Sequence, residues 1–420
     1  QVSLMQGVKL YIGNISQSQN CTVTYTKKSY KVTLNVTNGS SNVTSVTVQH
    51  GNNASFIITP SNGYRLELSG NSCGGTLSGS TYTISNITNA KSCSITLKKN
   101  LTLYNQILAD NPGRETRTDF SSVFTSTTSG TLYTATEKNV HNTSSTTVYY
   151  YAGNTTNNWV KFAGYYWRII RTNADGSVRM LYSGTSHDTT NGFINSNTAF
   201  NTLTDSPKYV GYMYGNSDST LANARINANS STIKNVIDNW YRTNLTNYTN
   251  YISTTAVYCN DRTLAPRNYY GTTSAIFYFT GYYRIYTNKT PTYDCDNQYD
   301  AFSGSNSYAK LTYPIALMTA DEIAYAGGAF AVNNASAWYH FNSANEAIVN
   351  KMWYLLTPNY ANNNNPSVFC VVSAMPWLGQ LYNCDGVYRE AGVRPVISIK
   401  SSVYAITGSG TPNNPYTLSM

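Results

Sequence analysis

Among the residues that could do chemistry, the seven cysteines are those whose roles can be narrowed furthest from the sequence. No two of them form a Cys-x-x-Cys motif, and the four histidines have no spacing typical of a metal site. We therefore expect neither a bound metal nor a cofactor. An odd number of cysteines instead fits three disulfide pairs with one cysteine left over.

Three disulfides are predicted, and Cys73 is the natural partner of Cys93 because both lie in the same repeat module. The predicted pairs are Cys73–Cys93, Cys259–Cys295 and Cys370–Cys384, which leaves Cys21 without a partner. The alternative is that all seven cysteines are buried free thiols. Because disulfides persist in oxidising compartments, the predicted pairs indicate an extracellular or cell-surface protein.

Residues for catalysis are not grouped in any recognisable way. There is no Ser/His/Asp set, no phosphate-binding loop and no pair of carboxylates with a clear role. His187 and Asp188 are adjacent but isolated, and a surface turn explains them. We expect a protein that is not an enzyme and has no catalytic residues.

Residues suited to binding gather instead near the end of the chain. Segments 353–358 and 392–398 are apolar and regular, and the stretch between them has no helix or strand period. Trp377, Tyr382 and Tyr388 in this stretch combine large contact area with few rotatable bonds. Binding residues often lie on loops held by a rigid frame. An ordinary polar loop beside a core strand is the alternative.

Composition indicates a mainly β protein. The chain has 420 residues, of which 41% are hydrophobic and only 11% are charged, and it contains 38 tyrosines. Runs of Val, Ile, Thr and Tyr alternate with Asn-Gly and Ser-Gly turn signals. No stretch of about 18 apolar residues could cross a membrane.

The net charge of +9 lies mostly in the first hundred residues, where eight Lys and Arg face the single acid Glu67. Two interpretations remain open, namely a solvated basic module or a module close to an anionic cell-wall polymer or headgroup. Nucleic-acid binding is not expected, because no stripe of Lys and Arg is interleaved with the aromatic residues of the larger part.

An internal repeat divides this region. Segment 7–24 matches segment 79–96 at an offset of 72 residues, and Cys21 corresponds to Cys93. We predict that 28–100 is a small β-sandwich and that 1–27 is the end of a truncated copy, so that the native protein continues upstream. The repeat resembles the immunoglobulin-like repeats of bacterial surface proteins.

The rest of the chain predicts a connector over 101–150 and one α+β domain over 151–420. A short helix or connector covers 101–110, and a β-hairpin joins 159–171 to 177–182. A helix starts after Ser231, with an apolar stripe from Ile233 to Tyr241. A second helix starts at the capping box of Thr319 and Glu322 and ends at Gly327.

This order of elements resembles bacterial surface proteins with a C-type-lectin-like domain. The segment 359–391 is similar to the target regions of diversity-generating retroelements, in which randomised residues line a ligand-binding face. Four residues depart from the simplest randomisation scheme, namely Met375, Trp377, Gln380 and Glu390. Arg394, within the apolar strand that follows, is expected to be structural.

The candidate ligand-binding residues come from the resemblance and from the aromatic and charged side chains of this segment. They are Asn359, Tyr360, Ala361, Phe369, Val372, Ala374, Met375, Trp377, Gln380, Tyr382, Asp385, Tyr388, Arg389 and Glu390.

The expected function is that of a secreted or surface-displayed ligand-binding protein of the adhesin or receptor type. Its partner would be a protein or glycan on another cell, a host or a phage, and its anchor would lie outside this chain. The main alternative is a structural subunit of an extracellular fibre or surface layer. Calcium-dependent sugar binding, and an enzyme similar to the copper-dependent formylglycine-generating oxidases, are further alternatives.

Overall fold

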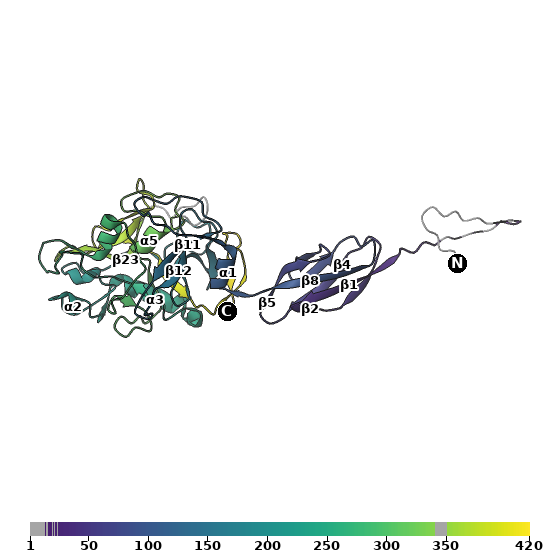
Figure 1. Cartoon of the computed structure of the whole chain (residues 1–420), viewed down its shortest axis with the longest axis horizontal. Helices are drawn as coiled ribbons and strands as arrows, with labels where there is room; N and C mark the ends of the chain where they lie inside the picture. Colours follow the sequence, from purple (N-terminus) through teal and green to yellow (C-terminus); the bar gives the residue numbers. More distant parts are fainter. Residues whose placement is uncertain (1–12, 14–15, 19, 21, 23, 341–350) are drawn as a thin grey trace. The chain divides into compact units, whose positions relative to one another are not determined.

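The computed structural model describes residues 13, 16–18, 20, 22, 24–340 and 351–420 (Figure 1). The chain divides into two compact units, Gln1–Asn100 and Leu101–Met420. Most of the truncated repeat copy over 1–27, including Cys21, lies outside the described residues.

The first unit contains two sheets of four strands each. One sheet has the order β3-β1-β8-β5 and contains β1 (Ser29–Thr37), β3 (Ser45–Gln49), β5 (Tyr64–Asn71) and β8 (Lys91–Lys99). The other has the order β2-β4-β7-β6 and contains β2 (Gly39–Ser41), β4 (Ala54–Pro60), β6 (Thr76–Ser78) and β7 (Thr81–Ile84).

A single apolar core joins these two sheets. In β4, buried Ala54, Phe56 and Ile58 alternate with exposed residues, because successive side chains of a strand point to opposite faces. They form one cluster with Val32 of β1 and Ile95 of β8. The predicted β-sandwich is therefore present as two packed sheets.

The second unit is built around an eleven-stranded sheet. Eight of its strands follow the order β10-β11-β12-β14-β13-β29-β28-β9, while β15 pairs with β14 and β27, and β27 also pairs with β22. The strands are β9 (Leu101–Thr102), β10 (Gly113–Glu115), β11 (Thr131–Glu137), β12 (Thr146–Tyr150), β13 (Trp159–Phe162), β14 (Tyr165–Thr172), β15 (Val178–Tyr182), β22 (Ala316–Leu317), β27 (Pro395–Ile399), β28 (Tyr404–Thr407) and β29 (Tyr416–Leu418).

A six-stranded sheet is also present, and its strands carry half of the candidate binding residues. Its path is β16-β26-β23-β24-β25, and β20 pairs with β23. The strands are β16 (Asn195–Thr198), β20 (Phe277–Tyr278), β23 (Met352–Ala361), β24 (Ser367–Val372), β25 (Gln380–Asn383) and β26 (Ala391–Val393). Two short pairs are also present: β17 (Met213–Tyr214) with β18 (Asn229–Ser230), and β19 (Tyr258–Cys259) with β21 (Ala301–Phe302).

The helices of this unit are short. They are α1 (Leu103–Asp110), α2 (Leu221–Ala224), α3 (Thr232–Asn244), α4 (Thr280–Tyr282) and α5 (Ala320–Ala326), with 3₁₀ turns at Pro207–Val210 and Thr246–Tyr251 and a π-helix at Tyr283–Asn288.

Local sequence signals are confirmed where helices begin and end. The Ser231 hydroxyl accepts a hydrogen bond from Lys234 N and caps α3. Thr319 and Glu322 form the predicted capping box of α5, and Gly327 ends that helix at φ 114°. The predicted hairpin is β14–β15, although a turn at 163–164 divides its first arm into β13 and β14.

Two predictions about this unit need correction. Residues 101–150 contribute β9, α1, β10, β11 and β12 to the second unit, so they are part of it rather than a connector. The stretch between 359 and 391 is less irregular than its sequence indicates, because β24 and β25 lie within it. These strands lack a period-2 pattern because β24 is covered on both faces.

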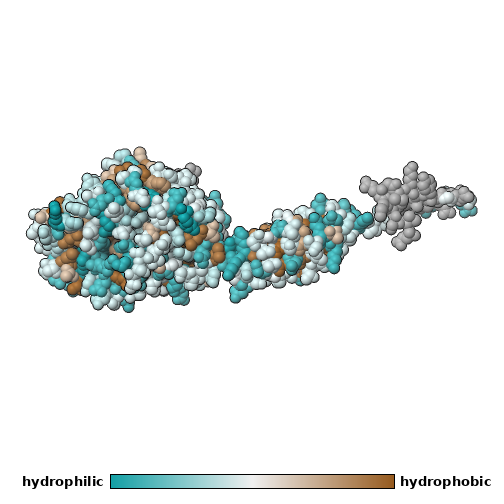
Figure 2. All heavy atoms as spheres, viewed as in Figure 1, coloured by the Kyte–Doolittle hydropathy of each residue, from teal (hydrophilic) through white to brown (hydrophobic). Residues whose placement is uncertain are grey.

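Polar residues cover most of the described surface of the second unit, and few residues of the chain are charged. On the face drawn in Figure 2, hydrophilic and near-neutral residues cover most of the unit, and hydrophobic residues appear in scattered patches. This agrees with a chain in which 11% of residues are charged.

Candidate ligand-binding surface

Several of the predicted binding residues lie on the surface. Met375, Trp377, Tyr388 and Tyr382 are 72%, 53%, 44% and 36% exposed. Asp385, Arg389 and Glu390 are also exposed, and Tyr360, Val372 and Ala374 are half-buried. An exposed tryptophan is uncommon in this chain, since Trp159, Trp167, Trp338 and Trp353 are buried.

Four other predicted residues are buried, and we correct their assignment as ligand contacts. Asn359, Ala361 and Phe369 are at most 1% exposed, and Gln380 is 8% exposed. The first three belong to β23 and β24, which lie inside the sheet with neighbours on both sides. These side chains support the surface from beneath and do not form part of it.

The exposed Tyr382 belongs to a larger group of aromatic side chains. Its ring stacks on Phe330 with centroids 5.2 Å apart, and Phe330 contacts Tyr286 at 5.0 Å. Tyr282 lies 5.1 Å from Tyr286 and 4.4 Å from Tyr278. We call this group the aromatic band; it consists of Tyr278, Tyr282, Tyr286, Phe330, Tyr360 and Tyr382.

Tyr360 lies at the end of the aromatic band opposite to Tyr382. Its ring centroid lies 6.2 Å from that of Tyr278, and β20 pairs with β23 at these two residues. The Tyr360 hydroxyl accepts a hydrogen bond of 3.2 Å from Asn365 Nδ2. Asn365 and Tyr388 both lie against Gly386, where φ is 122° and a side chain would collide with them. Tyr388 is therefore close to this end of the band.

Trp377 lies in a turn outside the aromatic band. The turn that contains it is held by the segment after Phe330, because Asn333 Nδ2 donates to Pro376 O at 2.8 Å. In addition, Asn334 N donates to Leu378 O at 3.0 Å. These bonds place the turn that contains Trp377 next to the segment that follows Phe330, a member of the aromatic band.

The sequence interpretation missed four members of the aromatic band, namely Tyr278, Tyr282, Tyr286 and Phe330. A signal was present, because the three tyrosines recur every four residues. That spacing places Tyr282 and Tyr286 on one side of the helical segment Thr280–Asn288, while Tyr278 lies in β20 just before it. No comparable pattern marks Phe330, which meets Tyr382 through the bridge between Phe330 and Leu381.

The hydroxyls of Tyr282 and Tyr360 in the band remain uncharged at neutral pH. Burial and the neighbouring phenols of Tyr278 and Tyr286 raise the pKa of Tyr282 to about 12. Burial also raises the pKa of Tyr360. The band can therefore offer apolar ring edges together with neutral hydrogen-bond donors and acceptors.

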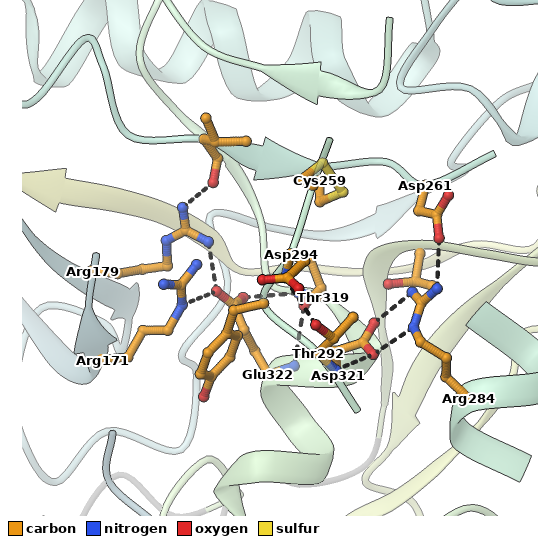
Figure 3. Close-up of a pocket in the computed structure, with 14 residues that line it drawn as sticks. Arg171, Arg179, Cys259, Asp261, Arg284, Thr292, Asp294, Thr319, Asp321 and Glu322 are labelled. Atoms are coloured by element: carbon orange, nitrogen blue, oxygen red, sulfur yellow. Dashed lines mark hydrogen bonds and ion pairs between the residues drawn. A yellow bond between two sulfur atoms is a disulfide. The ribbon is translucent and has the colours of Figure 1, made fainter. Parts of the chain in front are cut away.

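A buried network of charges lies beneath α5 (Figure 3). Glu322 Oε1 accepts hydrogen bonds from Arg179 Nη1 at 2.5 Å and from Arg171 Nε at 3.0 Å. Arg171 Nη1 also reaches Glu137 Oε2 at 2.7 Å. Burial raises the pKa of Glu322, but the guanidinium groups of Arg179 and Arg171 lower it further, so the net shift is downward.

A second ion-pair group adjoins it. Arg284 contacts Asp321 Oδ1 at 3.0 Å and Asp261 Oδ2 at 2.6 Å. The two groups and the neighbouring Cys259–Cys295 disulfide leave a space of about 20 Å³, which has room for about one water molecule. Both carboxylates of this group are engaged by donors, so the site braces α5 and is not suited to binding a substrate.

The three predicted disulfides are all formed. Cys73–Cys93, Cys259–Cys295 and Cys370–Cys384 have Cα–Cα distances of 5.5, 5.9 and 5.5 Å. Cys370 lies in β24 and Cys384 follows β25, so this disulfide fixes the strand that carries Tyr382. Three disulfides are typical of proteins from non-reducing compartments such as the extracellular space.

Arg394 has the structural role that its sequence context predicts. It is buried, and its guanidinium donates to Tyr182 O at 3.2 Å and to Tyr339 O at 2.5 Å. Nearby, burial and the positive charge of Arg394 lower the pKa of His340 to about 4. His340 is therefore neutral under physiological conditions.

The described residues contain neither a candidate metal site nor a candidate membrane-spanning helix. In that part of the chain, no group of three or more His, Cys, Asp or Glu residues could hold a metal ion. No helix there is long and apolar enough to cross a membrane.

The fold and surface define a mainly β, disulfide-containing protein with an aromatic surface in its second unit. The chain matches no protein-family model, and comparisons with curated proteins and with solved structures find no significant match.

Proposed function

We propose that this chain is a secreted or surface-displayed ligand-binding protein of the adhesin or receptor type. In this proposal the first unit is an immunoglobulin-like repeat and the second a C-type-lectin-like domain. The ligand is a protein or glycan on another cell, a host or a phage. It contacts the aromatic band together with Trp377, Tyr388 and the charged residues beside them.

One observation carries the proposal. Trp377, Tyr382 and Tyr388 are exposed, although tryptophan and tyrosine side chains elsewhere in the second unit are mostly buried or half-buried. Tyrosine and tryptophan dominate the binding energy of protein interfaces, because they bury much area at a small cost in conformational entropy. The contacts with Phe330 and Tyr286 extend this surface beyond the segment 359–391.

The surface is also rigid, which favours binding. Tyr382 is held in place by the Cys370–Cys384 disulfide and by the stacked ring of Phe330. The ring of Phe369 packs edge-to-face against Phe330 and supports it in turn. A surface that is ordered before binding loses less conformational entropy when the complex forms.

The test compares two triple variants of the full chain. Fluorescently labelled protein is titrated onto intact bacteria and cultured animal cells, and flow cytometry identifies the cell type that binds. On that cell type, Trp377→Ala/Tyr382→Ala/Tyr388→Ala should weaken binding at least tenfold. The matched control removes three exposed large side chains elsewhere in the second unit, Ile226, Tyr308 and Tyr404, and should change binding less than twofold.

Equal affinity of the two variants would reject the aromatic surface as the binding site. Failure of every cell type to bind the native chain would leave the fibre or surface-layer subunit as the better explanation. Light scattering separates that alternative directly, because a structural subunit assembles as its concentration rises, whereas a receptor remains at constant mass.

A further inference from the structure

One edge strand of the first unit lacks the features with which proteins usually block pairing between sheet edges. The edge strands of the two sheets are β3, β5, β2 and β6. Strands β2 and β6 have three residues each, and β5 contains Arg65, Glu67 and two irregularities of register. Strand β3 has five residues, without charge, proline or irregularity in its register with β1. Short strands, charges and bulges protect an edge, so β3 is the least protected edge in the described part of this unit.

The backbone groups of β3 divide between β1 and the open side of the sheet. Leu34 N donates to Thr44 O at 2.9 Å, which continues the antiparallel register of β1 and β3. Hydrogen-bonded pairs alternate along such a ladder, so Val46 and Val48 bond to β1. The residues whose N–H and C=O groups point outward are Ser45, Thr47 and Gln49. Apart from a bond from Asn52 N to Gln49 O, these outward groups have no protein partner within the described residues.

The side chains of β3 are arranged symmetrically about its centre. Val46 lies opposite Val32 and Val48 opposite Tyr30, so both valines are on the core side of the sheet. Both remain half-buried at the rim of the core, and Thr47 between them is exposed on the other face. The strand therefore has an apolar residue on either side of a central threonine and a polar residue at each end.

We propose that β3 pairs with β3 of a second copy of this chain, antiparallel and centred on Thr47. In that register Thr47 lies opposite its own counterpart and Ser45 lies opposite Gln49, and these pairs make about six backbone hydrogen bonds. Val46 of each copy lies opposite Val48 of the other, at a non-hydrogen-bonded position with Cα atoms about 4.5 Å apart. The half-buried valines thereby cover one another.

A second copy is the occupant that this strand itself specifies. A partner strand must present backbone groups at every second position, apolar side chains on the core side and no charge, and β3 meets all three conditions. A two-fold contact uses the same patch on both subunits, which this symmetry allows. The nearly palindromic order of side chains thus favours self-pairing over pairing with an unrelated strand.

The positive charge of the first unit opposes this pairing only weakly. Lys31 of β1 lies opposite Thr47. Three strand spacings separate Lys31 from its counterpart in the other copy, about 14 Å at about 4.8 Å each, which exceeds the screening length of about 8 Å at physiological salt.

The association is closed, because each chain contributes one β3 and the pair uses both. A receptor that pairs in this way reaches a constant mass at two chains, whereas a fibre subunit continues to grow. The pairing does not involve the aromatic band of the second unit, so it is independent of the proposed function.

The first test follows the mass of the full chain by sedimentation velocity from low micromolar to submillimolar concentration. The native chain should change from one chain to two and then remain constant. Thr47→Lys places like charges directly opposite each other and should weaken the dimer at least tenfold. The matched control, Thr59→Lys, adds the same charge at an exposed position of the central strand β4 and should change dimerisation less than twofold. Circular dichroism confirms that both variants are folded.

The second test traps the register. Directly opposite residues of a hydrogen-bonded pair have Cα atoms about 5.5 Å apart, within the range that a disulfide spans. In a Cys21→Ser background, Thr47→Cys should therefore form a covalent dimer under mild oxidation, and Thr59→Cys should not.

A native chain that stays at the mass of one chain, or grows beyond two, would overturn the proposal. Equal dimerisation of the two lysine variants, or equal yields of covalent dimer from the two cysteine variants, would also overturn it. The Trp377→Ala/Tyr382→Ala/Tyr388→Ala variant should dimerise as the native chain does, so failure of the proposed function and failure of this proposal give different results.

Discussion

At the scale of single residues, the buried carboxylate of Glu322 has a structural role. Its carboxylate forms ion pairs with Arg171 and Arg179 and also accepts a hydrogen bond from Thr319 N at 3.0 Å. Glu322 therefore belongs both to an ion-pair network and to a helix cap. Buried carboxylates often mark active sites, but here every partner is structural. The helix that Glu322 begins leads directly to Phe330, so the network indirectly positions the aromatic band.

Replacement of Glu322 by glutamine should be strongly destabilising. The variant leaves Arg171 and Arg179 buried with less compensating charge, and loss of one partner of a buried ion pair costs about 3–5 kcal/mol. Chemical denaturation of the second unit measures this free energy. Glu390→Gln, which removes an exposed carboxylate, should change stability by less than about 0.5 kcal/mol. Similar values for both variants would contradict the network's role.

His340 should make stability depend on pH. Its pKa is about 4 in the folded state, below the value of 6.5 for an ordinary histidine, because of burial and Arg394. A lowered pKa contributes stability that is fully present above pH 6.5 and is lost as the pH falls toward 4. Between pH 7 and pH 5 the unfolding free energy should fall by about 2 kcal/mol.

The matched measurement uses urea denaturation at pH 7 and pH 5. His340→Gln should remove most of this pH dependence, whereas His50→Gln, at an exposed position of the first unit, should leave it unchanged. A pH dependence that persists in His340→Gln would show that another group is responsible.

At the scale of elements, the turn that carries Phe330 connects the two parts of the aromatic band. Ala329 and Val332 form a bridge, and Ala331 N donates to Leu381 O at 2.9 Å. Ala331 has φ 60°, in the left-handed region that residues with a side chain rarely adopt. Strained backbone of this kind persists where the surrounding structure fixes it, which is common at functional sites.

Replacement of Ala331 by glycine should therefore stabilise the second unit. Relief of the left-handed strain should outweigh the greater flexibility of glycine in the unfolded chain, for a net gain of about 0.5–1 kcal/mol. Ala335→Gly, at an exposed position without positive φ, should instead lose up to about 1 kcal/mol. Thermal denaturation of both variants tests the difference, and a loss in both would contradict the strain.

Elements set by local residues could be predicted from the sequence, and those set by distant contacts could not. The capping box of α5 and the start of α3 depend on residues three positions apart, and both are confirmed. The aromatic band depends on Phe330 meeting Tyr382, more than 50 residues along the chain, which no local pattern encodes. Asn359 and Phe369 were misplaced because strands buried on both faces lose the alternation that would reveal their orientation.

For the whole molecule, the two units have different surface chemistry. The first unit is a two-sheet module with six Lys and Arg residues and one acid between residues 28 and 100, and the second presents aromatic residues among few charges. In our proposed function the aromatic surface of the second unit binds a ligand on another surface. The disulfide framework, which the cysteine positions predicted in full, supports both units.

Site-specific photo-crosslinking tests the central claim most directly. A benzophenone amino acid is placed at Tyr382 in the aromatic band, or at the more exposed Tyr308 as the control, in the otherwise native full chain. After illumination on the cell type that binds, the account predicts a covalent adduct with a cell-surface molecule from position 382 and none from position 308. Adducts of equal yield from both positions, or from 308 alone, would contradict it.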